Sequence, residues 1–160
     1  MIAVEAAWRR WYPLAREKAR RLLGSGGDAD DVAQEVFLRF WREGMAEAPT
    51  RTASAWLYKT TTRLSIDRLR ELRSRNDHEA ALGDLPAAGA PDEQLAVRQE
   101  LQGIAESVPV AELEVAILHR VDRLDQGEIA EVVGITTRTV RRLLGRFDRR
   151  LAELRGGGAR

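Results

Sequence analysis

The chain of 160 residues contains no cysteine. This absence excludes disulfide bonds and metal sites built on thiolates. The two histidines, His78 and His119, lie too far apart in the sequence to form a metal-ligand motif. A glycine-rich phosphate loop and a Ser/His/acid set are also missing from the sequence. We therefore expect no cofactor, no metal centre and no enzymatic activity.

Long apolar runs are absent too. No segment approaches the ~20 consecutive apolar residues that a helix needs to cross a bilayer. The first residues, MIAVEAAWRRWYPLAREKARR, meet charge before any apolar stretch long enough for a signal peptide. These patterns predict a cytoplasmic protein that has no contact with membranes.

The net charge is only +1, but it is distributed unevenly along the chain. Residues 51–75 hold seven basic and two acidic side chains, and residues 136–155 hold the same numbers. Residues 76–135, between them, hold three basic and thirteen acidic side chains. Two separated basic segments suit two phosphate-binding surfaces, although solvated helix faces would give the same charge pattern.

Every periodic segment of the sequence has helical spacing, and strand-like alternation does not occur. The expected fold class is therefore all-α. The expected helices lie near residues 5–23, 28–42, 53–74, 92–107, 109–123, 125–133 and 136–154.

A domain boundary is expected at residues 76–91, NDHEAALGDLPAAGAP. This stretch combines glycine, proline, alanine and acids without helical periodicity, as a flexible linker does. It divides the chain into two small helical domains, residues 1–75 and residues 92–160.

The helix expected at residues 28–42 has an unusually regular pattern. Its apolar stripe consists of Ala29, Val32, Ala33, Val36, Phe37, Phe40 and Trp41. Asp28 is the expected N-cap. The remaining face is acidic and amide-rich with one Leu, which suits a basic helical partner as well as solvent.

The segment Gln126–Leu143, QGEIAEVVGITTRTVRRL, has the spacing of a helix-turn-helix. Ala130 is small where two helices cross, and Gly134 tolerates the positive φ of the turn. Ile129, Val133, Ile135, Val140 and Leu143 are the expected internal core. The second helix then projects Thr136, Thr137, Arg138, Arg141, Arg142 and Arg146, side chains that fit the DNA major groove.

Two stretches, DADDVAQEVFLRFWR at residues 28–42 and AWLYKTTTRLSIDRLR at residues 55–70, closely resemble region 2 of the extracytoplasmic-function sigma factors of bacterial RNA polymerase. Residues 124–151, with EIAEVVGI, resemble region 4 of the same family. Both matches occur in the family order. The resemblance implies an alternative sigma factor that binds core RNA polymerase and directs promoter recognition, DNA opening and transcription initiation.

The resemblance also assigns roles to residues. It implies that Asp31, Gln34, Glu35, Leu38 and Arg39 dock on the clamp helices of the polymerase beta-prime subunit. It implies that the −10 element is bound by Arg63, Asp67, Arg68 and Arg70, with the loop before that helix. It implies that the −35 element is bound by Thr136, Thr137, Arg138, Arg141, Arg142 and Arg146. The expected partners are promoter DNA, core polymerase with its beta flap, and an anti-sigma factor.

Several positions depart from the family pattern. Arg63 stands where many members carry Asn, Arg138 occupies a common Gly position, and Val110–Leu113 lacks the usual arginines. These departures leave the promoter sequence unpredicted. Two other functions remain open from the sequence: a one-component helix-turn-helix regulator with an N-terminal interaction module, and a sigma-like decoy that sequesters an anti-sigma factor.

Overall fold

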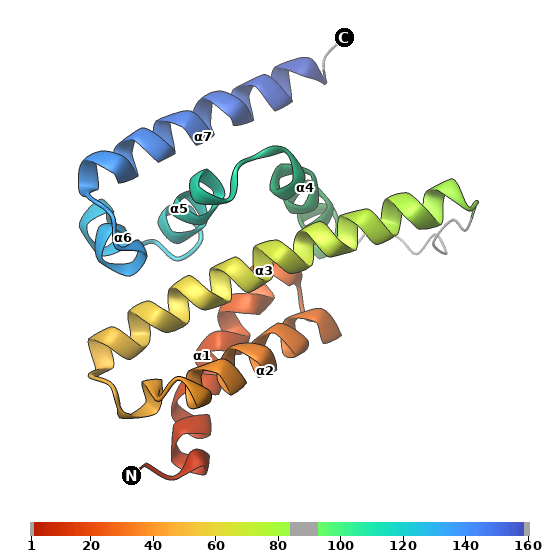
Figure 1. Cartoon of the computed structure of the whole chain (residues 1–160). Helices are drawn as coiled ribbons and strands as arrows, with labels where there is room; N and C mark the ends of the chain where they lie inside the picture. The colour runs from red at the N-terminus through yellow and green to blue at the C-terminus, as the bar shows by residue number, and fades with distance from the viewer. Residues whose placement is uncertain (1, 84–92, 159–160) are drawn as a thin grey trace.

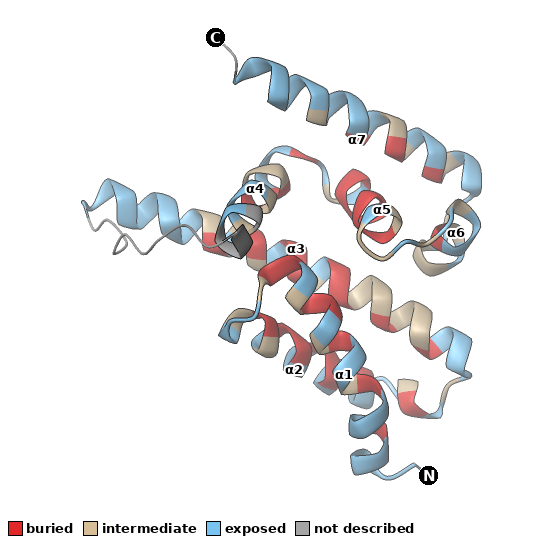
Figure 2. Cartoon of the chain, turned by 180° about the vertical axis from the view of Figure 1, so that it is seen from behind, coloured by how far each residue is buried: buried red, intermediate tan, exposed pale blue. Residues whose placement is uncertain are grey.

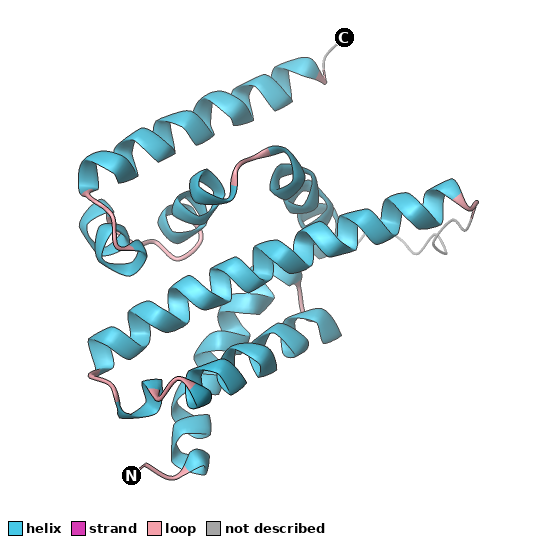
Figure 3. Ribbon diagram, viewed as in Figure 1, coloured by secondary structure: helices cyan, strands magenta, loops and turns pink. Residues whose placement is uncertain are grey.

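The structure is a computed structural model that describes residues 2–83 and 93–158. Within these two ranges it contains α-helices, one 3-10 helix and no strand (Figure 3). The helices are α1 (Val4–Leu23), α2 (Gly27–Arg42), η1 (Met45–Glu47), α3 (Thr50–Ala81), α4 (Glu93–Ser107), α5 (Val110–Arg120), α6 (Gln126–Val133) and α7 (Thr137–Gly157). The all-α fold class is confirmed.

The longest helix, α3, runs through the middle of the molecule (Figure 1). Helices α1 and α2 pack on one side of α3, and α4, α5 and α6 lie on its other side. Helix α7 forms the outermost layer, where it covers α5 and α6. Helix α3 therefore contacts both halves of the chain.

Helix α1 owes its position to one apolar face. Ala7, Trp11, Ala15 and Ala19 recur every four residues and are all buried. Small alanines let α2 approach closely, and the Trp11 ring packs at a tilt against Phe40 with ring centroids 5.2 Å apart. The predicted N-terminal helix is confirmed.

Helix α2 carries the predicted stripe, with two corrections. Six of its seven apolar positions are buried, but Trp41 is 39% exposed because it lies at the edge of the stripe near the helix end. Asp28 is not the N-cap, since the helix already begins at Gly27. The Asp28 carboxylate instead accepts a hydrogen bond from Arg98 on α4 at 2.8 Å.

Helix α3 is longer than the sequence pattern suggests. It continues to Ala81, six residues into the stretch 76–91 that was predicted to be a linker. Asn76 donates a hydrogen bond to Gln102 on α4, and Arg73 pairs with Asp77 one turn later. These contacts extend the helix where its apolar periodicity has ended. Residues 84–91 of the predicted linker lie outside the described residues, and the proposed domain boundaries stay a prediction.

The helix-turn-helix elements form as predicted. Asp125 accepts a hydrogen bond from the Glu128 backbone at 2.8 Å, and the Glu128 carboxylate accepts one from the Asp125 backbone at 2.7 Å. This capping box starts α6. Gly134 ends the helix with φ of 78°, a conformation that a side chain disfavours. The preceding helix α5 ends at Arg120, earlier than the predicted Arg123, which has φ of 62° and so cannot be helical.

Among the described residues, no helix is long and apolar enough to span a membrane.

Candidate nucleic-acid and polymerase interfaces

The N-terminal half of α7 presents the predicted −35 residues on the surface. Thr136 caps the helix, and its hydroxyl accepts a hydrogen bond from the Thr139 backbone at 3.2 Å. Val140, Leu144 and Phe147 are buried against α5 and α6. Because these apolar residues fix the rotation of α7, the polar residues face outward. Figure 2 shows this outer face as exposed along most of the helix.

All six predicted −35 residues are exposed. Arg138, Arg142 and Arg146 have no ion-pair partner within residues 2–83 and 93–158. Arg141 donates a hydrogen bond to Gln126 at 3.0 Å, which directs it along the start of α6. The structure thus brings the predicted −35 set together on the exposed surface of the first half of α7.

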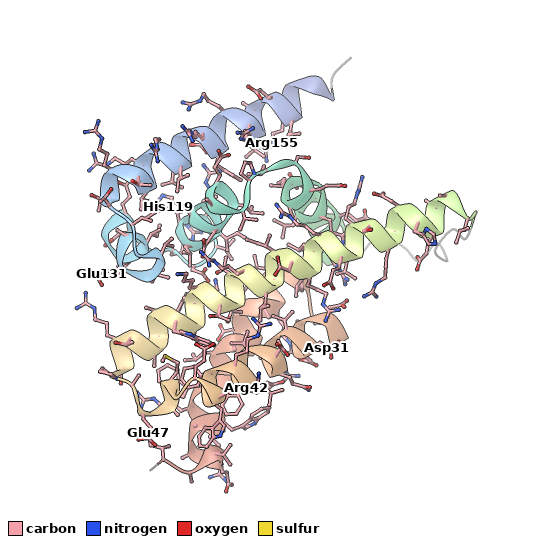
Figure 4. The ribbon with its side chains drawn as sticks, viewed as in Figure 1. Asp31, Arg42, Glu47, His119, Glu131 and Arg155 are labelled. Carbon is pink, nitrogen blue, oxygen red and sulfur yellow. The ribbon has the colours of Figure 1, made fainter. Side chains whose placement is uncertain are left out.

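The predicted polymerase-docking residues lie on the outer face of α2. Asp31 is 64% exposed and Glu35 is 49% exposed. Glu35 accepts a hydrogen bond from Arg39 at 2.7 Å, and Leu38 is 56% exposed. Figure 4 labels Asp31 on the part of α2 that runs beside α3. An exposed Leu beside acids is the composition expected of a helix that docks on a basic partner.

A polar cavity of about 380 Å³ joins this face to α3. Its walls include Asp31, Glu35 and Arg39 from α2, and Asp67 and Arg68 from α3. Arg68 reaches toward α2, at 3.9 Å from Asp28 and 4.0 Å from Asp31. The docking face and two predicted −10 residues, Asp67 and Arg68, are therefore parts of a continuous surface.

The other two predicted −10 cations, Arg63 and Arg70, already bind groups in the second half of the chain. Arg63 donates hydrogen bonds to both oxygens of Glu114 on α5, at 3.0 and 3.3 Å. Arg70 donates to the carbonyl oxygens of Ala105 and Val108, at 2.7 and 3.1 Å. The sequence suggested an open basic exterior on α3, and in the structure much of that exterior faces the second half of the chain.

A second cavity of about 350 Å³ lies at the start of this surface. Its walls include Trp56, Lys59, Arg63 and Asp67. The Trp56 ring packs edge-on against Phe40 at 5.6 Å, and its Nε1 donates a hydrogen bond to Glu43 at 2.8 Å. Trp56 is thus anchored in the core while one edge reaches the cavity. This arrangement has the size and polarity for an unstacked base.

Four charged side chains that the sequence analysis did not single out are buried. Glu114 pairs with Arg63, and Glu112 accepts a hydrogen bond from Arg150 at 2.7 Å. Lys18 pairs with Asp122, and both side chains are at most 3% exposed. Burial lowers the pKa of Lys18, and the nearby Asp122 opposes that shift. The acids lie within the largely apolar segment VAELEVAILHRVD, a signal that points to burial of this segment.

A family model described as Sigma-70 region 2 matches residues 7–75 of this chain. The chain is 28% identical to the "Probable ECF RNA polymerase sigma factor SigI" of Mycobacterium tuberculosis, over 95% of this chain and 55% of the relative. It therefore spans little more than half the length of that relative, and 63% of the length of the SigE sigma factor of Mycolicibacterium smegmatis.

Two shorter relatives are covered more fully. The sigma factor CnrH of Cupriavidus metallidurans is 30% identical over 79% of this chain and 73% of the relative. The ECF sigma factor SigW of Bacillus subtilis is 31% identical over 76% of this chain and 72% of the relative.

A solved structure has the same fold. It is the sigma factor RpoE of Bartonella quintana in complex with the anti-sigma factor NepR, with a TM-score of 0.53 at 18% identity over 94% of both chains. With this fold and these relatives, the chain belongs to the ECF family of RNA polymerase sigma factors.

Proposed function

We propose that this chain binds core RNA polymerase and carries it to a particular set of promoters, as an alternative sigma factor. In this function the chain is not itself an enzyme, because polymerase performs the chemistry. The chain supplies two DNA-binding surfaces and a docking surface, and its place of action is the cytoplasm.

The observation that carries the proposal is the outer face of α7. The six predicted residues from Thr136 to Arg146 are all exposed, and three of the arginines have no ion-pair partner among the described residues. A helix of this diameter fits the major groove, where arginine reads guanine edges and threonine contacts thymine methyl groups or phosphates. We assign this face to the −35 element.

The docking surface is assigned to the outer face of α2. Asp31 and Glu35 supply negative charge, and the exposed Leu38 supplies an apolar contact. The clamp helices of the polymerase beta-prime subunit are the partner that the family resemblance implies. The beta flap is the expected partner of the second half of the chain.

The −10 element is assigned to α3 and the cavity at its start. Arg63 and Arg70 lie on the side of α3 that faces the second half of the chain, and Arg68 lies on the side toward α2. Cations of this kind track a single-stranded backbone, while the cavity beside Trp56 receives a flipped base.

The test is run-off transcription with purified core polymerase and a library of promoters. We expect specific transcripts only when both the chain and the core enzyme are present. Duplex binding by the chain alone is measured in parallel at physiological salt. Tight sequence-specific binding without polymerase, combined with no transcript, would instead establish a one-component regulator.

An anti-sigma factor is the expected regulatory partner. Capture of such a protein by a chain that supports no transcription would identify a decoy. The two measurements therefore separate all three functions that the sequence leaves open.

A further inference from the structure

A hydrogen bond between side chains joins the two helices of the helix-turn-helix. Arg141 on α7 donates from its Nε to the Oε1 of Gln126 on α6, at 3.0 Å, across 15 positions of the chain. The bond connects the first turn of α6 to the second turn of α7. Arg141 is exposed, so this contact lies at the edge of the surface assigned to the −35 element.

The position of Gln126 is fixed by its own helix. Gln126 is the first residue of α6 and directly follows the cap residue Asp125. Ile129 and Val140 are completely buried where α6 and α7 pack against each other. Gln126 itself is half-buried. Because the cap and this packing hold the backbone of both helices, the Gln126 amide meets Arg141 in a defined geometry.

The bond leaves most of the Arg141 guanidinium available. Within residues 2–83 and 93–158, Arg141 makes no other hydrogen bond and no ion pair. With Nε engaged, the fork formed by Nη1 and Nη2 stays free at the end of the side chain. This fork matches the O6 and N7 acceptors that guanine presents in the major groove. Arg141 is thus held in a form that suits one bidentate base contact.

The partner of Arg141 is neutral, whereas two other arginines of α7 pair with carboxylates. Arg150 pairs with Glu112, and Arg155 pairs with Glu100. A carboxylate neutralises the guanidinium charge and competes with DNA for it. An amide oxygen orients the guanidinium and leaves its positive charge in place. An amide is therefore the kind of partner that suits an arginine that binds DNA.

The carboxylates nearest to this bond are engaged elsewhere. A cavity of about 730 Å³ lies between the end of α5, the start of α6 and α7, and both Gln126 and Arg141 are among its walls. Asp125 and Asp148 line the same cavity. Asp125 belongs to the capping box of α6, and Asp148 pairs with Arg120. The amide is thus the acceptor that sets the direction of Arg141.

Orientation before binding favours a specific contact. An arginine without a partner loses rotamer freedom when it binds a base, and an arginine that is already oriented loses less. We propose that Gln126 is a positioning residue for the −35 contact, whose amide holds the Arg141 guanidinium so that Nη1 and Nη2 bind one guanine. The DNA contact rests on the proposed function, while the hydrogen bond stands on the geometry of the two helices.

The test measures base preference with core polymerase and a promoter library randomised at the −35 element. Gln126→Met keeps the length and helix propensity of the side chain and removes the acceptor. It should reduce discrimination about two- to tenfold at the single base that Arg141→Ala also relaxes, and leave the other −35 bases unchanged. In the Arg141→Ala background, Gln126→Met should have no further effect, because the side chain that it orients is gone.

A conservative variant and a matched control accompany this test. Gln126→Glu keeps an acceptor for Nε, so it should retain discrimination at that base while it lowers the affinity for all sequences, since its negative charge repels DNA. Asp148→Asn weakens another exposed contact at the same cavity and should change no base preference. Circular dichroism and thermal melting check that each variant keeps its fold, and Gln126→Ala replaces Gln126→Met if the latter unfolds.

Several outcomes overturn the proposal. They are an unchanged preference in Gln126→Met, equal relaxation at several −35 bases, a full additional effect in the Arg141→Ala background, and an Arg141→Ala variant with unchanged preference.

The hydrogen bond is also tested without DNA, from the Arg141 Nε–H signal in proton–nitrogen NMR spectra. Its exchange with water should be severalfold slower in the unchanged chain than in Gln126→Met, and equal exchange rates overturn the positioning role. If no form of the chain supports initiation with core polymerase, the proposed function fails, and the exchange rates still decide whether Gln126 holds Arg141.

Discussion

Helices α3 and α7 carry the same kind of side chain and use it differently. Both belong to segments with seven basic and two acidic residues. On α7, Arg138, Arg142 and Arg146 are exposed without an ion-pair partner in the described part of the chain. On α3, Arg63 and Arg70 bind the second half of the chain. Net charge predicts that a helix binds anions, but packing decides whether the anion is DNA or another part of the protein.

The difference arises from position in the fold. Helix α7 is the outermost layer, so only one of its faces is covered. Helix α3 is covered on two sides, by α1 and α2 and by α4, α5 and α6. Its cations therefore meet the acids of the chain's own middle segment, where thirteen acidic residues gather.

The largest expected effect comes from α2, because without docking on polymerase neither α3 nor α7 can act on a promoter. Changing Asp31 and Glu35 to Lys should abolish association with core polymerase, because the docking face then repels a basic partner. Both residues are exposed, and surface changes of this kind usually alter folding stability by within about 0.5 kcal/mol. Co-purification with core enzyme and thermal melting measure the two quantities. An unfolded double variant would show that these acids are structural.

The next effect is specific to α7. Replacing Arg138 or Arg141 by Ala should cost about 1–3 kcal/mol of binding free energy at the −35 element if the arginine contacts a guanine bidentately. The preference at one −35 base should relax, while the −10 preference stays unchanged. Selection of transcripts from a randomised promoter library measures both preferences. Arg155→Ala, at the far end of the same helix, is the control that should change neither.

A smaller effect concerns the turn that orients α7. Gly134→Ala should destabilise the second half by about 1–2 kcal/mol, because an L side chain disfavours φ of 78°. Gly103→Ala, within α4 and with open space around it, is the matched control and should be neutral or stabilising. Denaturant unfolding measures both. Equal effects would mean that the turn does not need the left-handed conformation.

The helix-turn-helix and the contacts between the two halves of the chain differ in how well the sequence predicts them. The helix-turn-helix was predictable because its signals are local: Asp125 and Glu128 lie three residues apart, and Gly134 follows one helix directly. The exposure of α7 follows from the spacing of Val140 and Phe147. Local hydrogen bonds and helical periodicity are sufficient for these features.

The contacts between the two halves of the chain were not predictable in the same way. Arg63 lies 51 residues from Glu114, and Lys18 lies 104 residues from Asp122. Periodicity within one helix carries no information about such pairs. Glu is usually exposed, so the burial of Glu114 is unexpected. It is tolerated because Arg63, a residue distant in the sequence, pairs with its charge. The extension of α3 to Ala81 likewise depends on contacts such as Asn76 with Gln102.

The most direct test of the division between the two helices is permanganate reactivity of promoter thymines in complexes with core polymerase. Arg63→Ala and Arg68→Ala should reduce reactivity in the bubble while upstream protection is retained, and a pre-melted promoter should partly restore initiation because unstacking is already done. Arg138→Ala and Arg141→Ala should instead weaken upstream protection. If the α7 variants also failed on the pre-melted promoter, or if the α3 variants shifted the −35 preference, the two basic surfaces would be assigned to the wrong ends of the promoter.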